Sequence, residues 1–154
     1  MNRLLLALAT LGPVGRAPVA PATAASVVVA LAGWFIPPAP LWVAIVLLAA
    51  GSVIAAWICG RAEATLGHDA HPIVLDELVG QSIALLGAPH WWPAYLASVA
   101  LFRLFDIWKP FGAQEAQELP GGIGVVADDV IAGLAACLAL QLALWGLRLL
   151  GVWV

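Results

Sequence analysis

The sequence predicts an all-α, polytopic integral membrane protein with about five membrane-embedded helices in one bundle. Apolar residues, counted as Ala, Val, Ile, Leu, Met, Phe, Trp, Tyr and Cys, make up 64% of the 154 residues. Charged residues make up only 10%, whereas soluble domains contain about 25%. Residues 17–60, 78–102 and 130–147 contain no charged side chain. Each stretch can hold a membrane span, which takes about 20 apolar residues.

The composition also excludes several classes of protein. Six basic and nine acidic residues give a net charge of −3, so a nucleic-acid partner is not expected. The high apolar content excludes a disordered chain. Cys59 and Cys137 lie in apolar runs without a C-x-x-C pair, and we interpret them as small core residues. The sequence has no internal repeat, so residues 1–154 are expected to form a single membrane-embedded domain.

Proline and glycine residues mark the expected helix boundaries. A short helix near the N-terminus is expected to lie at the membrane surface. The five membrane-embedded helices are expected at about residues 22–36, 41–59, 72–86, 91–108 and from 123 to the C-terminus. Gly60 is the predicted stop of the second of these helices. The fifth is longer than one span requires, so it is expected to be tilted, or broken near Gly133 or Gly146.

Alternating passage of these helices through the membrane places three loops on one face. The loops span residues 12–21, 60–72 and 109–122. All but one of the basic residues fall at or near this face: Arg3, Arg16, Arg61, Arg103 and Lys109. Because cytoplasmic loops carry an excess of Lys and Arg, we predict that this face is cytoplasmic.

Acidic side chains gather at three helix ends on the same face. They are Asp69 in a loop, the pair Asp76-Glu77, Asp106, and the pair Asp128-Asp129. A charge in the apolar region costs roughly 2.5–3.5 kcal/mol on insertion scales, so we predict that these six carboxylates form a catalytic site. Capping of helix N-termini is the alternative, but capping needs one carboxylate per helix rather than an adjacent pair.

Carboxylate oxygens without cysteine ligands suit Mg²⁺ or Mn²⁺ rather than zinc. The two adjacent pairs are the predicted ligands of one or two Mg²⁺ ions: Asp76, Glu77, Asp128 and Asp129. Asp69 or Asp106 is expected as a further metal ligand. If the substrate is a phosphate ester, either could instead be the general acid that protonates its leaving oxygen. We expect water activated by Mg²⁺ to be the nucleophile, and a covalent aspartyl-phosphate route stays open.

Four residues are candidates for binding a substrate phosphate. Arg103 offers a planar fork and Lys109 a point charge, although both could instead reach toward the membrane interface. Arg103 could also pair with Asp106, three residues further along the helix. Gly122 belongs to a glycine-rich helix start whose free N–H groups suit an anion. Thr23 lies at the start of the first membrane-embedded helix, as a simple cap or as a phosphate contact.

Three motifs in this chain resemble those of the phosphatidylglycerophosphatase A family. The central motif of the family is similar to His68-Asp69 followed by Ile73-Val74-x-Asp76-Glu77-x-x-Gly80. The second is similar to Phe102-Arg103-x-Phe105-Asp106-x-x-Lys109-Pro110. The third is similar to Gly121-Gly122-x-Gly124-x-x-x-Asp128-Asp129-x-x-Ala132-Gly133. An N-terminal motif of the family is similar to Pro21-x-Thr23-x-x-Ser26, but Ala22 and Ala25 stand where the family has glycines. The segment after Pro110 also differs from the family pattern.

The resemblance implies a Mg²⁺-dependent membrane phosphatase that removes the terminal phosphate of phosphatidylglycerophosphate, giving phosphatidylglycerol. It also implies the bacterial inner membrane, and the basic residues predict that the site lies on its cytoplasmic side. The sequence leaves the oligomeric state open, including a homo-oligomer.

The alternative function is an ion- or proton-coupled small membrane transporter subunit, since buried carboxylates also form proton relays. Charges at one face and the lack of an inverted repeat disfavour it. A third hypothesis, an inactive structural subunit, leaves the paired carboxylates unexplained.

Overall fold

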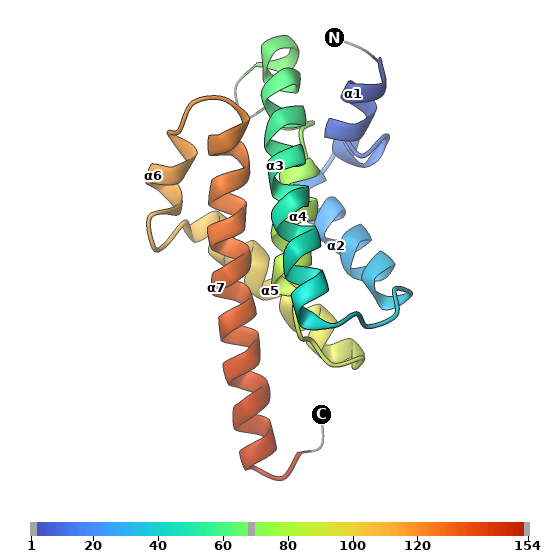
Figure 1. Ribbon diagram of the computed structural model, residues 1–154, viewed down its shortest axis with the longest axis vertical. Coiled ribbons are helices and arrows are strands. Elements are labelled where there is room, and N and C mark those ends of the chain that lie inside the picture. Colours follow the sequence, from blue (N-terminus) through green and yellow to red (C-terminus); the bar gives the residue numbers. More distant parts are fainter. Residues whose placement is uncertain (1–2, 68–69, 153–154) are drawn as a thin grey trace.

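The computed structural model describes residues 3–67 and 70–152, and all regular structure within these ranges is helical (Figure 1). The elements are α1 (Arg3–Ala9), the 3-10 turn η1 (Val14–Arg16), α2 (Pro21–Trp34), α3 (Leu41–Leu66), α4 (Leu75–Ala84), α5 (Trp92–Trp108), α6 (Ala113–Gln117) and α7 (Gly122–Leu149). The all-α prediction is therefore confirmed. A short N-terminal helix is also confirmed, as α1, and the short helix α6 was not predicted.

Among the described residues, α3 and α7 are long and apolar enough to cross a membrane, by length and composition. The mean hydropathy of their most apolar stretches is 2.4 and 2.1. Only 11% of the α3 stretch and 28% of the α7 stretch are buried inside the molecule. The core helix of a soluble protein would be mostly buried, so these exposed apolar faces suit lipid acyl chains. Five membrane-embedded helices stay a prediction, because α2 is a shorter apolar helix of 14 residues.

The predicted stop at Gly60 is wrong, because α3 continues to Leu66. Gly60 instead allows the backbones of α3 and α7 to approach each other. A Cβ atom at Gly60 would lie 3.0 Å from the backbone nitrogen of Gly122. Figure 1 shows α3 and α7 side by side and antiparallel. Small residues commonly permit such close packing between membrane helices. Gly60 therefore marks a close contact between helices rather than the end of one.

Of the two alternatives expected for the last helix, a break near Gly133 or Gly146 is wrong, because α7 runs without interruption from Gly122 to Leu149. Gly133 packs against the backbone of Gly80, where any Cβ atom would collide. Short α4 is the centre of the arrangement, and it packs against α2, α3, α5 and α7. This packing brings the first turn of α4 and the second turn of α7 to the last turns of α5.

Candidate active site

A polar cavity of about 250 Å³ lies where α4, α5 and α7 meet. Seven residues line it: Asp76, Glu77, Asp106, Ile107, Lys109, Asp128 and Asp129. Five of the six predicted catalytic carboxylates are thus gathered in one place. The sixth, Asp69, lies outside the described residues.

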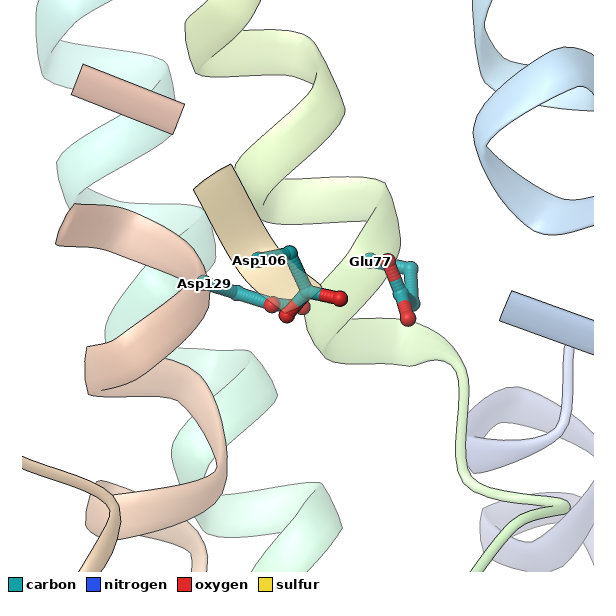
Figure 2. A group of neighbouring side chains, drawn as sticks. All are labelled: Glu77, Asp106 and Asp129. Atoms are coloured by element: carbon teal, nitrogen blue, oxygen red, sulfur yellow. The ribbon is translucent and has the colours of Figure 1, made fainter. Parts of the chain in front are cut away.

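Three of these carboxylates form a close cluster, shown in Figure 2. Glu77, Asp106 and Asp129 each offer an oxygen atom, and these oxygens all lie within 4.8 Å of one another. They come from three helices, α4, α5 and α7. Glu77 and Asp129 are buried, with 7% and 3% of their surface exposed, and Asp106 is half-buried. Three hard oxygen ligands at this spacing match the donor chemistry that Mg²⁺ prefers, so the residues fit such an ion.

Arg103 lies beside this cluster and contacts two of its members. One guanidinium nitrogen, Nη1, donates a hydrogen bond of 2.5 Å to Glu77. The other, Nη2, lies 3.0 Å from Asp106, which confirms the ion pair predicted from their spacing of three residues. The Nε atom of Arg103 is buried without a hydrogen-bond partner among the described residues. The guanidinium thus joins α4 to α5 and offsets part of the negative charge.

Lys109 brings a second cation to the cavity from the end of α5. Its backbone adopts a left-handed conformation (φ 50°), and its N–H closes the helix by donating to the Phe105 carbonyl at 2.7 Å. The amine donates to Asp128 and, at 2.9 Å, to the side-chain oxygen of Gln117. Burial alone would lower the pKa of Lys109, but the Asp128 carboxylate raises this pKa above its ordinary value. Lys109 therefore stays a cation.

Asp76 and Asp128 line the cavity but lie outside the close cluster of three. Asp76 accepts a hydrogen bond of 2.9 Å from the Glu77 backbone N–H in the first turn of α4. The helix dipole also favours a negative charge in the first turn of a helix. Asp128 pairs with Lys109. Each adjacent pair therefore divides, as helix neighbours that point in different directions can, with one member in the cluster and the other beside it.

Thr23 and Gly122 are not among the residues that line the cavity. Gly122 is buried against α3, where a Cβ atom would collide with the backbone of Ala56 and Gly60. Packing against α3 thus accounts for this glycine. Thr23 lies half-buried in the first turn of α2, a helix start that has no side-chain cap.

Sequence reasoning missed Gln117 and the packing role of Gly80. A Cβ atom at Gly80 would lie 2.5 Å from the Phe102 ring and 2.8 Å from the Asp129 carbonyl oxygen. Gly80 could have been identified from the sequence, because it lies one turn after Asp76-Glu77 in the central motif. No signal marked Gln117, since its helix α6 was not predicted.

A cluster of hard oxygen ligands beside two cations is suited to phosphate chemistry, in which charge neutralisation dominates. Together with two helices long and apolar enough to cross a membrane, this site points to a membrane-associated enzyme that acts on a phosphate group. The sequence model of the phosphatidylglycerophosphatase A family matches residues 7–144. The chain belongs to this family and is a lipid phosphatase.

Curated relatives agree with this assignment. A protein of Escherichia coli named "Phosphatidylglycerophosphatase A" is 32% identical over 78% of this chain and 72% of its own length. A Haemophilus influenzae protein of the same name is 41% identical over 54% of this chain and 53% of its own length. A protein of Bacteroides thetaiotaomicron, named "Putative phosphatidylinositol-3-phosphatase", is 35% identical over 85% of this chain and 87% of its own length. No solved structure matches the chain significantly.

Proposed function

We propose that this protein hydrolyses the terminal phosphate monoester of phosphatidylglycerophosphate, giving phosphatidylglycerol and phosphate. One observation carries the proposal: three carboxylates within 4.8 Å of one another share a cavity with Lys109 and lie against Arg103. The names of the relatives from Escherichia coli and Haemophilus influenzae support this substrate.

Glu77, Asp106 and Asp129 are the proposed ligands of Mg²⁺. This set keeps two of the ligands expected from the sequence and includes Asp106, which was expected as a further ligand. A bound Mg²⁺ would supply neutralisation of phosphate charge and would make water a better nucleophile. The chemistry of the donor set supports the assignment, because the three oxygens are hard and belong to two buried carboxylates and one half-buried one.

The two cations bind the phosphate oxygens. Arg103 offers planar N–H groups and Lys109 a compact ammonium. Both counter the negative charge that the phosphoryl group retains through its transfer. Asp128 holds Lys109 in position, and Asp106 on α5 is held by Arg103 one turn earlier on the same helix. The protein thus contributes mainly positioning and electrostatic stabilisation.

The protein is proposed to cross the bacterial inner membrane several times, with the cavity on the cytoplasmic side. A lipid phosphate lies at the membrane surface while its acyl chains stay in the bilayer. The cavity is near the ends of α4, α5 and α7, where such a headgroup could reach it. The excess of basic residues toward this end supports the cytoplasmic assignment.

Phosphatidylinositol 3-phosphate is a second candidate substrate. The observation that favours it is the name of the Bacteroides thetaiotaomicron relative, which matches most of this chain. Both lipids present a phosphate monoester, so the same carboxylates and cations suit either. A transporter function is not favoured, because the charges gather in one cavity near helix ends.

Phosphate release from the two lipids tests the proposal. The purified protein in detergent is given each lipid with Mg²⁺, and Asp129→Asn serves as the control for contaminating phosphatases. We expect a higher kcat/KM for phosphatidylglycerophosphate. A higher value for phosphatidylinositol 3-phosphate would change the substrate assignment. Equal release by wild type and Asp129→Asn would contradict the proposed site.

A further inference from the structure

We propose that Gln117 is a positioning residue that aims the Lys109 ammonium at the substrate phosphate; this inference rests on the proposed function. Gln117 is the last residue of α6, outside the carboxylate cluster and outside the residues that line the cavity. Its side-chain oxygen accepts a hydrogen bond of 2.9 Å from the Lys109 amine. Gln117 thus contacts the site through Lys109.

The geometry of the ammonium shows what this contact does. A lysine ammonium has three N–H donors and no acceptor. Two of them are directed at Asp128 on α7 and Gln117 on α6. Within residues 3–67 and 70–152 the amine has these two acceptors, which fix its orientation from different helices. The third N–H can then point toward a ligand of the cavity that Lys109 lines. With Asp128 alone, the amine could rotate about that single contact.

The position of Gln117 is itself fixed by the packing of α6 on α7. Gly124, in the first turn of α7, is buried, and a Cβ atom there would collide with the carbonyl groups of Gln117 and Leu119. Ala113, at the other end of α6, is fully buried. The short helix therefore rests directly on the helix that supplies Asp128, so both acceptors of the Lys109 amine belong to one packed unit.

Pre-orientation matters for lysine because its side chain is long and flexible. Holding the amine before the substrate binds removes part of the entropy loss that binding would otherwise require. The benefit falls on phosphate binding, so it should be seen in KM and in the affinity for phosphate. Removing a contact that acts equally on bound substrate and transition state raises KM while kcat is unchanged.

The test compares Gln117→Met with Gln114→Met. Methionine keeps the length of glutamine but has no amide oxygen. Gln114 is on the same helix and exposed, so it controls for the change on α6 itself. The readouts are kcat and KM for the lipid, the thermal midpoint, and the Kd of inorganic phosphate measured by calorimetry with Mg²⁺ present.

We expect Gln117→Met to raise KM and the phosphate Kd by about three- to tenfold, as the loss of one hydrogen bond predicts. Its kcat and thermal midpoint should match those of Gln114→Met. Unchanged KM and Kd, or a lower thermal midpoint without a change in Kd, would overturn the inference. The phosphate Kd decides this even without lipid hydrolysis, and a wild type that releases no lipid phosphate would instead contradict the proposed function.

A double-variant measurement separates action through Lys109 from any other route. In a Lys109→Met background the amine is gone, so Gln117→Met should change the phosphate Kd by less than about twofold. A further rise as large as that in the wild-type background would show that Gln117 acts independently of Lys109, and would also overturn the inference.

Discussion

Arg103 and Glu77 form an ion pair of 2.5 Å that links α5 to α4 at the edge of the acidic cavity. The same guanidinium contacts Asp106 at 3.0 Å. Arg103 therefore contacts two of the three carboxylates that form the close cluster. Arg103 therefore holds two carboxylates in position, and the proposed function gives it a second role as a ligand of the substrate phosphate.

The first prediction concerns Arg103→Ala. A charge-assisted hydrogen bond is worth roughly 1.5–3 kcal/mol, so kcat/KM should fall by about ten- to hundredfold or more. Additional Mg²⁺ should not restore it, because the carboxylate ligands are all retained. Steady-state kinetics at rising Mg²⁺ concentrations measures both effects.

Arg61→Ala is the matched control for this change. Arg61 is an exposed arginine of α3 that lies over the Trp57 ring, outside the cavity. Its removal should leave kcat/KM nearly unchanged. Folding of Arg103→Ala must be verified by its thermal midpoint, since the buried Glu77 and the half-buried Asp106 lose their partner. Near-normal activity of folded Arg103→Ala, or its rescue by Mg²⁺, would contradict the assigned role.

The second prediction separates the metal ligands from their neighbours. Glu77→Gln, Asp106→Asn and Asp129→Asn each remove one charge from the cluster with little change in shape. Each should raise the Mg²⁺ concentration needed for half-maximal activity, and high Mg²⁺ should restore part of the loss. Asp128→Asn should affect KM more than the Mg²⁺ requirement, because Asp128 pairs with Lys109. Titration of Mg²⁺ against each variant provides the measurement.

Glu118→Gln controls for a general loss of negative charge, because Glu118 is exposed after α6.

Removal of the metal is a separate test. A chelator should abolish the activity of every active variant, and added Mg²⁺ should restore it. Ca²⁺ should restore little, because its longer bonds and looser geometry fit a compact carboxylate site poorly. Full activity in excess chelator would refute the metal site. A larger Mg²⁺ effect in Asp128→Asn than in Asp106→Asn would instead refute the proposed ligand set.

Most of the site could be predicted from sequence because charge is costly in an apolar chain. Asp76, Glu77, Asp106, Asp128 and Asp129 stood out against apolar surroundings, and all five line one cavity. The sequence indicates that one member of each adjacent pair faces the bundle, but it could not tell which member joins the cluster. That division depends on the rotation of α4 and α7 about their axes, which is set by contacts between distant residues.

The positions of helices could be predicted where they follow from composition. They could not be predicted where they depend on packing between helices. Apolar runs bounded by prolines located α2 and α5 to within a few residues. Glycine was harder to interpret, because the same residue ends helices and permits close helix contacts. At Gly60 and Gly133 the contact explanation holds, and it depends on the backbones of Gly122 and Gly80 in other helices.

The third prediction tests this packing through Gly80→Ala. The added methyl group would meet the Phe102 ring and the Asp129 carbonyl oxygen, and a backbone group cannot move aside cheaply. Overpacking of this kind costs about 1–3 kcal/mol, and the shift of α4 would separate Glu77 from Asp129. We expect a lower thermal midpoint together with a loss of activity.

Gly146→Ala is the control, because Gly146 lies inside α7 with open space around its Cβ position. Alanine favours a helix over glycine by about 1 kcal/mol, so this variant should be as stable as wild type or more stable. A Gly80→Ala protein with unchanged stability and activity would show that the helices can adjust at this contact, against the prediction.

The last prediction concerns the orientation of the protein in the membrane. Gly60 lies against Gly122, so residue 64 belongs to the same end of the molecule as the start of α7 and its acidic pair. Ala39 precedes α3 at the opposite end. The 26 residues of α3 span about 39 Å at 1.5 Å per residue, enough to cross a bilayer. Because basic residues gather toward the end that includes residue 64, that end should be cytoplasmic.

Single cysteines at these two positions decide the orientation. Ala64→Cys and Ala39→Cys are placed in a background without Cys59 and Cys137, and both positions are exposed. In intact bacterial cells, a membrane-impermeant maleimide should label Ala39→Cys. It should label Ala64→Cys only after the inner membrane is permeabilised, which also shows that the residue is reactive. Labelling of Ala64→Cys in intact cells would reverse the orientation and place the acidic cavity outside the cytoplasm.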